Sequence, residues 1–117
     1  MKFKEDNFQK SVCRFLDLNK VLWCHVANER KTSQQQGKRL KLKGVKSGVP
    51  DVLIFEPNNK YIGLAIELKI KPNKPTENQL NWLNNLNKKG WYTAICYNFN
   101  EFEHEFKKYY NETTKKN

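Results

Sequence analysis

The chain has 117 residues, which predicts a single domain over residues 1–117 whose last seven residues form a frayed polar tail. Its 38% hydrophobic and 13% aromatic content exclude a disordered chain, and no apolar run is long enough for a membrane span. The net charge of +10 favours a polyanionic partner, above all nucleic acid. Three widely spaced cysteines without a Cys-x-x-Cys motif fit reduced thiols in a cytoplasm.

The first third of the chain predicts a helix, a strand and a basic loop. Residues 4–18 carry an apolar stripe with helical spacing, and residues 21–27 are rich in strand formers. Residues 30–46 hold seven basic and no acidic side chains, so we expect a basic loop over residues 28–48. A solvated, solubilising loop is the alternative to a DNA-binding one. The candidate DNA contacts in this loop are Arg30, Lys31, Lys38, Arg39, Lys41, Lys43 and Lys46.

The middle of the chain predicts a β-hairpin. Residues 51–56 and 60–70 are strand-like, and the turn residues at 57–59 separate them. Apolar side chains alternate from Ile62 to Ile70, which predicts one buried face. The other face carries Gly63 and Ala65 before Glu67, and these small residues should leave room for a substrate.

The last third predicts a turn, a helix, a strand and a final helix. Lys71 and Lys74 lie in the turn at 71–75 and are further candidate DNA contacts. Thr76 and Gln79 match a capping box that opens a helix over 77–89, and Gly90 is its expected stop. A buried leucine stripe runs along this helix, and the tryptophans, Trp82 included, are expected in the core or an interface. Residues 91–97 and 100–110 follow as strand and helix.

The predicted order is therefore α-β-β-β-α-β-α, an α/β fold. It indicates a mixed central sheet flanked by helices on both faces, with an additional C-terminal helix. The third strand, its following helix and the fourth strand should form a parallel βαβ unit.

Asp51, Glu67 and Lys69 are the candidate catalytic residues. Glu67 and Lys69 are two apart on a strand, so they share a face. Asp51 opens the preceding strand, and in an antiparallel pair the start of one strand lies beside the end of the other. Two carboxylates and a lysine at one place can hold a hard divalent cation and a water. The alternative is an exposed Glu/Lys pair on a half-buried strand.

This pattern resembles the PD-(D/E)xK superfamily, which has the restriction-endonuclease-like fold with an αβββαβ core. More narrowly, the chain is similar to a VRR-NUC domain, and the resemblance runs from about residue 4 to residue 98. The segments that carry it are residues 25–30, Gly44 to Asp51, Gly63 to Lys69, and Gln79 to Leu83.

The resemblance implies a metal-dependent nuclease. Asp51 and Glu67 match its metal-binding carboxylates, with the main-chain carbonyl of Leu68 as a further ligand. Lys69 matches the lysine that orients or activates the attacking water. Mg²⁺ is the expected ion, and Mn²⁺ should also support activity, because oxygen ligands suit hard cations.

Two more residues are carried over from the family. Glu5 is the match for an acidic residue on the first helix near the metal, and Asp6 is the alternative. Gln79 matches a glutamine that faces the site, although a capping role at Thr76 would occupy the same side chain. His25 falls within the family pattern, but a structural role is favoured for a lone histidine on a strand.

The stand-alone viral members of the family imply a homodimer that is similar to Holliday-junction resolvases and acts on branched DNA. A phage-encoded chain would work in the bacterial host cytoplasm. A flap or restriction-type nuclease of the same superfamily is one alternative. A non-catalytic basic module that binds nucleic acid is the other.

Overall fold

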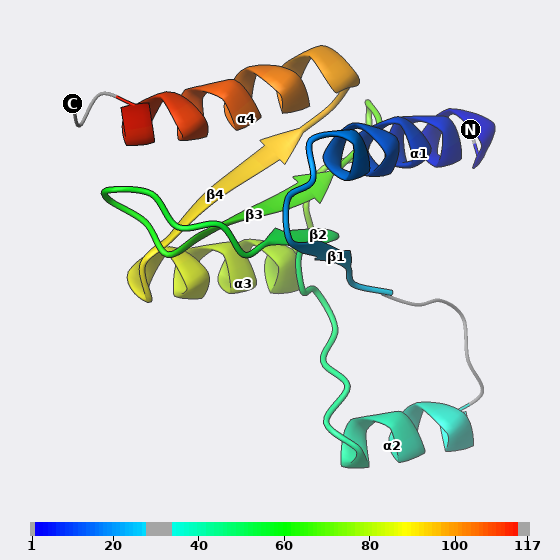
Figure 1. The fold of residues 1–117 in the computed structure, drawn as a ribbon. Coiled ribbons are helices and arrows are strands. Elements are labelled where there is room, and N and C mark those ends of the chain that lie inside the picture. Colours follow the sequence, from blue (N-terminus) through cyan, green and yellow to red (C-terminus); the bar gives the residue numbers. More distant parts are fainter. Residues whose placement is uncertain (1, 28–33, 115–117) are drawn as a thin grey trace.

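The fold was obtained as a computed structural model, which describes residues 2–27 and 34–114. These residues form four helices and four strands (Figure 1). They are α1 (Lys2–Leu18), β1 (Trp23–His25), α2 (Gln34–Leu42), β2 (Val52–Ile54), β3 (Gly63–Leu68), α3 (Glu77–Lys88), β4 (Trp91–Cys96) and α4 (Phe99–Thr114). None of the described helices is long and apolar enough to span a membrane.

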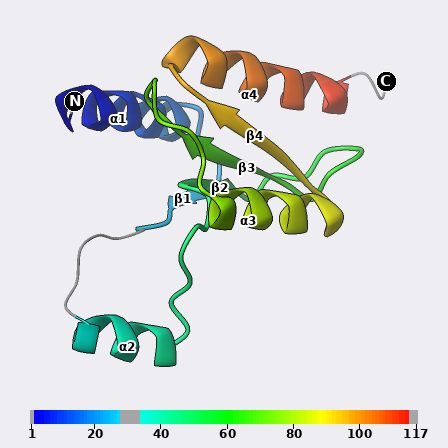
Figure 2. The ribbon, with the colours of Figure 1, turned by 180° about the vertical axis from the view of Figure 1, so that it is seen from behind.

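The strands form one mixed sheet whose spatial order, β1-β2-β3-β4, follows the chain. β1 pairs with β2 and β2 with β3 in antiparallel register, while β3 pairs with β4 in parallel. Helices α1 and α4 cover one face of the sheet and α3 covers the other (Figures 1 and 2). The predicted fold class, with its hairpin and its parallel βαβ unit, is thus confirmed.

The main core lies between the sheet and the helices α1 and α4. Alternate residues of β2 and β3 point into it, because side chains on a strand alternate between faces. The phenylalanines at its centre pack edge to face, with the ring centroid of Phe15 5.0–5.6 Å from those of Phe99, Phe102 and Phe106. The buried members of this cluster are Phe8, Val12, Leu16, Val52, Ile54, Leu64, Ile66, Leu68, Cys96, Phe102, Phe106 and Tyr109.

The second face of β3 is buried as well, which corrects the expected opening beside Glu67. All six residues of β3 are buried, because α3 covers the face that was expected to be accessible and β4 pairs along the edge of the strand. A Cβ at Gly63 would lie 2.6 Å from the Trp91 ring, so the small residue accommodates a tryptophan rather than a substrate. Only the carboxyl end of β3 remains available for chemistry.

Helix α3 begins and ends as the sequence predicts. The Thr76 hydroxyl accepts the N–H of Gln79, and the Gln79 side chain accepts the N–H of Thr76, which completes a capping box. Gly90 follows the helix with φ +106°, a conformation that favours glycine. The crossover from β3 to β4 therefore has defined ends.

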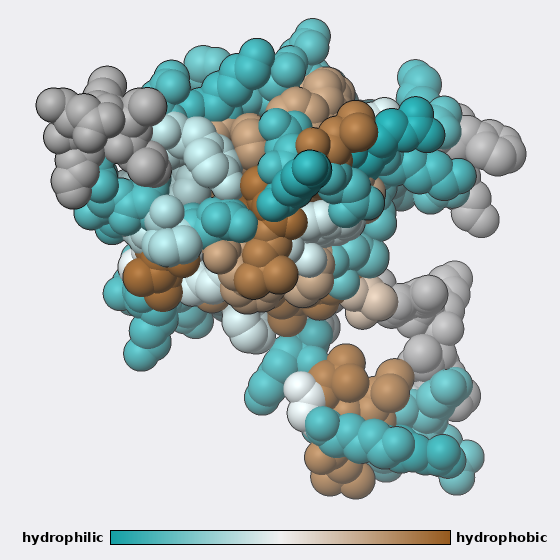
Figure 3. All heavy atoms as spheres, in the orientation of Figure 1, coloured by the Kyte–Doolittle hydropathy of each residue, from teal (hydrophilic) through white to brown (hydrophobic). Residues whose placement is uncertain are grey.

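The basic segment contains a helix, α2, where the sequence analysis expected only a loop. Its residues include no proline and no β-branched side chain, and Gln, Lys, Arg and Leu all favour helices. The helix lies apart from the sheet (Figures 1 and 2), which explains a radius of gyration of 15.0 Å where about 13.4 Å is expected for this length. Apolar surface stays exposed on this helix (Figure 3), where Leu42 is 88% exposed and Leu40 is half-buried.

Other element bounds also differ from expectation, and β2 and β3 are both shorter than the predicted 51–56 and 60–70. β1 covers three residues instead of 21–27, because only these pair with β2. α4 runs to Thr114, four residues beyond its predicted end at 110, so it includes the start of the predicted polar tail. Tyr109 anchors this helix, since its hydroxyl donates to the carbonyl of Glu56 at 2.6 Å and its own carbonyl accepts from Asn58 at 2.9 Å.

Candidate active site

The β2–β3 pairing brings Asp51 and Glu67 together. Val52 lies opposite Ile66, and the same register placed one residue further sets Asp51 opposite Glu67. The Leu68 N–H donates a hydrogen bond of 2.8 Å to Oδ2 of Asp51, which ties the carboxylate to the end of β3. The predicted convergence of the two acids at one end of the hairpin is therefore observed in the geometry.

Glu67 is the only charged side chain among the buried residues that the structure describes, with 2% of its surface exposed. Its Oε1 is buried and has no hydrogen-bond partner among the described groups, although buried polar atoms are almost always paired. Lys69 Nζ lies 3.7 Å from the other oxygen, Oε2. One oxygen of the Glu67 carboxylate thus lies near the Lys69 ammonium, and the other oxygen is available to a ligand.

Burial and mutual repulsion change the acidity of both acids. Burial, followed by the charge of Asp51, raises the pKa of Glu67 from 4.5 to about 8, while Lys69 opposes this shift. Burial also raises the pKa of Asp51, and the hydrogen bond from Leu68 and the nearby His25 work in the opposite direction. The pair therefore retains a proton near neutral pH unless a cation replaces it.

Comparison with known proteins agrees with this geometry. The family model described as the VRR-NUC domain matches residues 4–100. The chain belongs to the VRR-NUC family.

Solved structures show the same fold. A structure described as a VRR_NUC domain protein superposes with a TM-score of 0.71 at 22% identity and covers 93% of this chain and 89% of its own. Another, described as a VRR_NUC domain, has a TM-score of 0.65 at 21% identity, with 92% and 98% covered. No curated protein matches the chain. As a VRR-NUC domain, the chain is a nuclease of the restriction-endonuclease-like fold, and nucleases of this superfamily usually use a divalent metal.

The residues of this VRR-NUC site fit a hard divalent cation. Asp51 and Glu67 supply carboxylate oxygens, and the unpartnered Oε1 of Glu67 is the kind of atom that a metal would satisfy. No group of three or more His, Cys, Asp or Glu side chains lies together in the part of the chain that the structure describes. The ligand set available there is thus two carboxylates, to which the Leu68 carbonyl and waters would add.

The raised pKa values give a pH dependence that can be measured. Between about pH 4.5 and 8 the folded protein holds a proton on Glu67 that the unfolded chain releases. Without a divalent cation, the free energy of unfolding should therefore fall as pH rises through this window, by up to about 1.4 kcal/mol per pH unit. Bound Mg²⁺ should reverse the trend, because it replaces the proton.

Urea unfolding in EDTA and in Mg²⁺, from pH 5 to 9, would measure this effect. Glu67→Gln should flatten the curve in EDTA, whereas Glu103→Gln, on the outer surface of α4, should leave it unchanged. A wild-type curve in EDTA that rises with pH across the window would contradict the assignment.

The remaining residues predicted for the site, Glu5 and Gln79, differ in where they lie and what they contact. Glu5 lies exposed in the first turn of α1 with Asp6 beside it, and neither joins Asp51 and Glu67 in a group of three acids. Gln79 uses its side-chain oxygen to cap α3. The catalytic roles of Glu5 and Gln79 therefore stay predictions, and the capping role of Gln79 is the one visible in the contacts.

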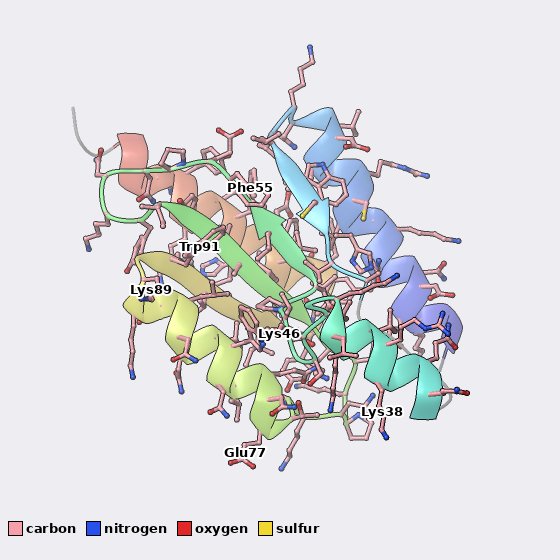
Figure 4. The ribbon with its side chains drawn as sticks, turned by 90° about the horizontal axis from the view of Figure 1, so that it is seen from below. Lys38, Lys46, Phe55, Glu77, Lys89 and Trp91 are labelled. Carbon is pink, nitrogen blue, oxygen red and sulfur yellow. The ribbon has the colours of Figure 1, made fainter. Side chains whose placement is uncertain are left out.

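Basic side chains lie on the segment that leads to Asp51. Lys38, Arg39, Lys41 and Lys43 are exposed on or just after α2, and Lys46 is in the connection to β2 (Figure 4). Beyond β3, Lys74 is exposed and the Lys71 ammonium lies 5.8 Å from the centre of the Tyr97 ring. Arg30 and Lys31 lie outside the described residues, as do Asn28 and Glu29.

His25 has a closer relation to the site than its sequence position indicated. Its Nδ1 lies 3.0 Å from the main-chain carbonyl of Asp51, and the Gln9 amide lies 3.2 Å from its Nε2. The chain Gln9–His25–Asp51 connects α1 to the start of β2. In the sequence, the only sign of this position near the site was that the family segment begins at His25. A structural role was nevertheless favoured, because a lone histidine on a strand is more often structural.

Proposed function

We propose that this chain is a single-domain, Mg²⁺-dependent endodeoxyribonuclease that cuts branched DNA as a homodimer, in the manner of a Holliday-junction resolvase. The observation that carries the proposal is the buried Glu67 opposite the half-buried Asp51 and beside Lys69, with one unpartnered carboxylate oxygen on Glu67. A protein that only bound DNA would gain nothing from two acids that repel phosphate.

Asp51 and Glu67 would hold the ion, with the Leu68 carbonyl as a further ligand. When bound, a divalent cation lowers the pKa of water and offsets charge on the phosphate. Mg²⁺ is preferred for these oxygen ligands, and Mn²⁺ should substitute.

Lys69 would position the attacking water and stabilise negative charge on the phosphate. Its side chain is 14% exposed and its ammonium lies beside Glu67, so it is held by burial and by the ion pair rather than free in solvent. A preorganised charge of this kind stabilises a transition state without a cost of reorganisation.

The dimer would place two such sites on two DNA backbones related by twofold symmetry. Exposed apolar side chains support self-association, since Leu18 and Leu22 keep 74% and 66% of their surface and Phe55 keeps 41%. Leu22 and Phe55 are adjacent, because the Phe55 N–H donates to the Leu22 carbonyl beside the edge strand β1. The free thiols Cys13, Cys24 and Cys96 suit a reducing cytoplasm, where we place the protein.

Cleavage of labelled four-way junction, flap and linear duplex DNA, in Mg²⁺ or EDTA, tests the proposal. We expect paired nicks near the junction centre in Mg²⁺ only, and a dimer in sedimentation velocity. Cleavage of flaps or ends by a monomer would replace the junction role with a flap or restriction-type activity. Binding without cleavage in Mg²⁺ and Mn²⁺ would leave a non-catalytic module.

A further inference from the structure

A cavity of about 430 Å³ lies between α3 and the segment that leads from α2 to β2. This volume falls within the range of about 300–1,000 Å³ that small-molecule sites occupy. The residues that line it are Lys41, Val45, Lys46, Ser47, Asn78, Asn81, Trp82 and Asn85. Lys46 projects between α2 and α3 in the view from below (Figure 4).

Local contacts hold the two walls of this cavity together. The Asn78 amide donates a hydrogen bond of 2.9 Å to the Ser47 hydroxyl. Gly48 follows with φ +87°, and a Cβ there would lie 2.8 Å from the backbone of Asn78. The opposite wall is one face of α3, since residues 78, 81, 82 and 85 have helical spacing.

The lining has the chemistry of a nucleotide site. Trp82 is half-buried and offers a flat aromatic surface, and three asparagine amides around it can each donate and accept hydrogen bonds. Two lysines supply positive charge, and no carboxylate is among the described residues that line the cavity. Aromatic stacking combined with positive charge is how proteins hold unpaired bases and their phosphates.

We propose that this cavity receives one unpaired nucleotide of the DNA substrate. Its base would stack on Trp82, the amides of Asn78, Asn81 and Asn85 would contact the base edge, and Lys41 and Lys46 would contact the phosphates. The base must be unpaired and unstacked, because both faces of a base inside a duplex are already covered. This inference rests on the proposed nuclease function and deepens it.

The cavity is close enough to the carboxylates to affect cleavage. Ser47 is four residues from Asp51, so their Cα atoms are at most about 14 Å apart. Both Ser47 and Glu67 lie on the side of the sheet that α3 covers. A nucleotide held there would be near the scissile phosphate, which would favour branch points and flaps over continuous duplex. Trp82, expected from the sequence in the core or an interface, would be a DNA contact.

Binding measured without cleavage tests the proposal. The protein carries Asp51→Asn and is titrated in EDTA, so that no cleavage occurs. One fluorescent duplex has a single unpaired nucleotide at a branch, and the other has an abasic site at the same position. Trp82→Ala should weaken binding of the DNA with the base by about 5- to 150-fold. It should change binding of the abasic DNA little, and Trp82→Phe should keep most of the affinity.

Two matched substitutions on α3 distinguish binding of the base in the cavity from general effects on the protein. Asn81→Ala, inside the cavity, should weaken binding of the base-containing DNA, whereas Asn84→Ala, an exposed position outside it, should not. This pair remains decisive if Trp82→Ala unfolds. Equal losses on the two DNAs, or equal effects of Asn81→Ala and Asn84→Ala, would overturn the proposal. Because no cleavage is required, a failed nuclease function would appear separately, as wild-type protein that binds but never cuts.

Discussion

Asp51→Asn should lower Mg²⁺-dependent cleavage by about 10³-fold or more while DNA binding persists. The substitution keeps the shape of the side chain and removes the charge that a cation needs. It also leaves an oxygen that can accept the Leu68 N–H, a contact that spans 2.8 Å in the wild type. The loss should therefore come from chemistry rather than from folding. Single-turnover cleavage, with binding measured separately in EDTA, distinguishes the two.

Lys69→Ala and Glu103→Gln complete this experiment. Lys69→Ala should also lower cleavage strongly, because it removes the ammonium 3.7 Å from Glu67. Glu103→Gln makes the same exchange of acid for amide on the surface of α4, where Glu103 pairs with Lys107, and should cut normally. If Asp51→Asn cleaves at the wild-type rate, Asp51 does not hold the ion.

Gly48→Ala should destabilise the protein by about 2–4 kcal/mol. A side chain at φ +87° costs about 1–2 kcal/mol, and the overlap of 2.8 Å with the Asn78 backbone adds a cost of overpacking. Relief of this overlap would move the segment at residues 47–51 away from α3 and would displace Asp51. We therefore expect lower stability and slower cleavage together.

Gly44→Ala is the matched control for this substitution. Gly44 has φ +96°, but nothing lies within 4 Å of the position where a Cβ would be. It should cost no more than about 1–2 kcal/mol and should leave cleavage near normal. Urea unfolding of both variants, compared by midpoint at constant slope, measures the difference. Equal destabilisation by the two substitutions would show that the contact with α3 contributes nothing.

The hairpin that carries the site could be predicted because local rules determine it. Alternation along β3 and the turn after β2 set the register, and the register sets Asp51 opposite Glu67. The start of α3 could be predicted equally well, since Thr76 and Gln79 form reciprocal hydrogen bonds within one turn. In both cases the partners are close in sequence or follow a fixed period.

Features that depend on packing between distant segments were missed. The room expected beside Gly63 is filled by Trp91, which is 28 positions further along the chain. Trp82 has the spacing of a core residue, yet it lines a cavity because the segment at residues 41–47 stands away from α3. Charge made α2 resemble a loop, although its residues favour a helix. No periodic pattern in one sequence contains this information.

The separation of α2 from the rest of the fold has a thermodynamic consequence. A helix of nine residues without packing is marginal in water, and α2 also places Lys38 and Lys41 three residues apart without a compensating acid in the helix. A DNA backbone bound there would remove this repulsion. The two effects are reciprocal. The factor by which bound DNA raises the equilibrium constant for forming α2 equals the factor by which the formed helix raises the affinity for DNA. The salt dependence of binding would then include the ordering of α2 as well as the release of counterions.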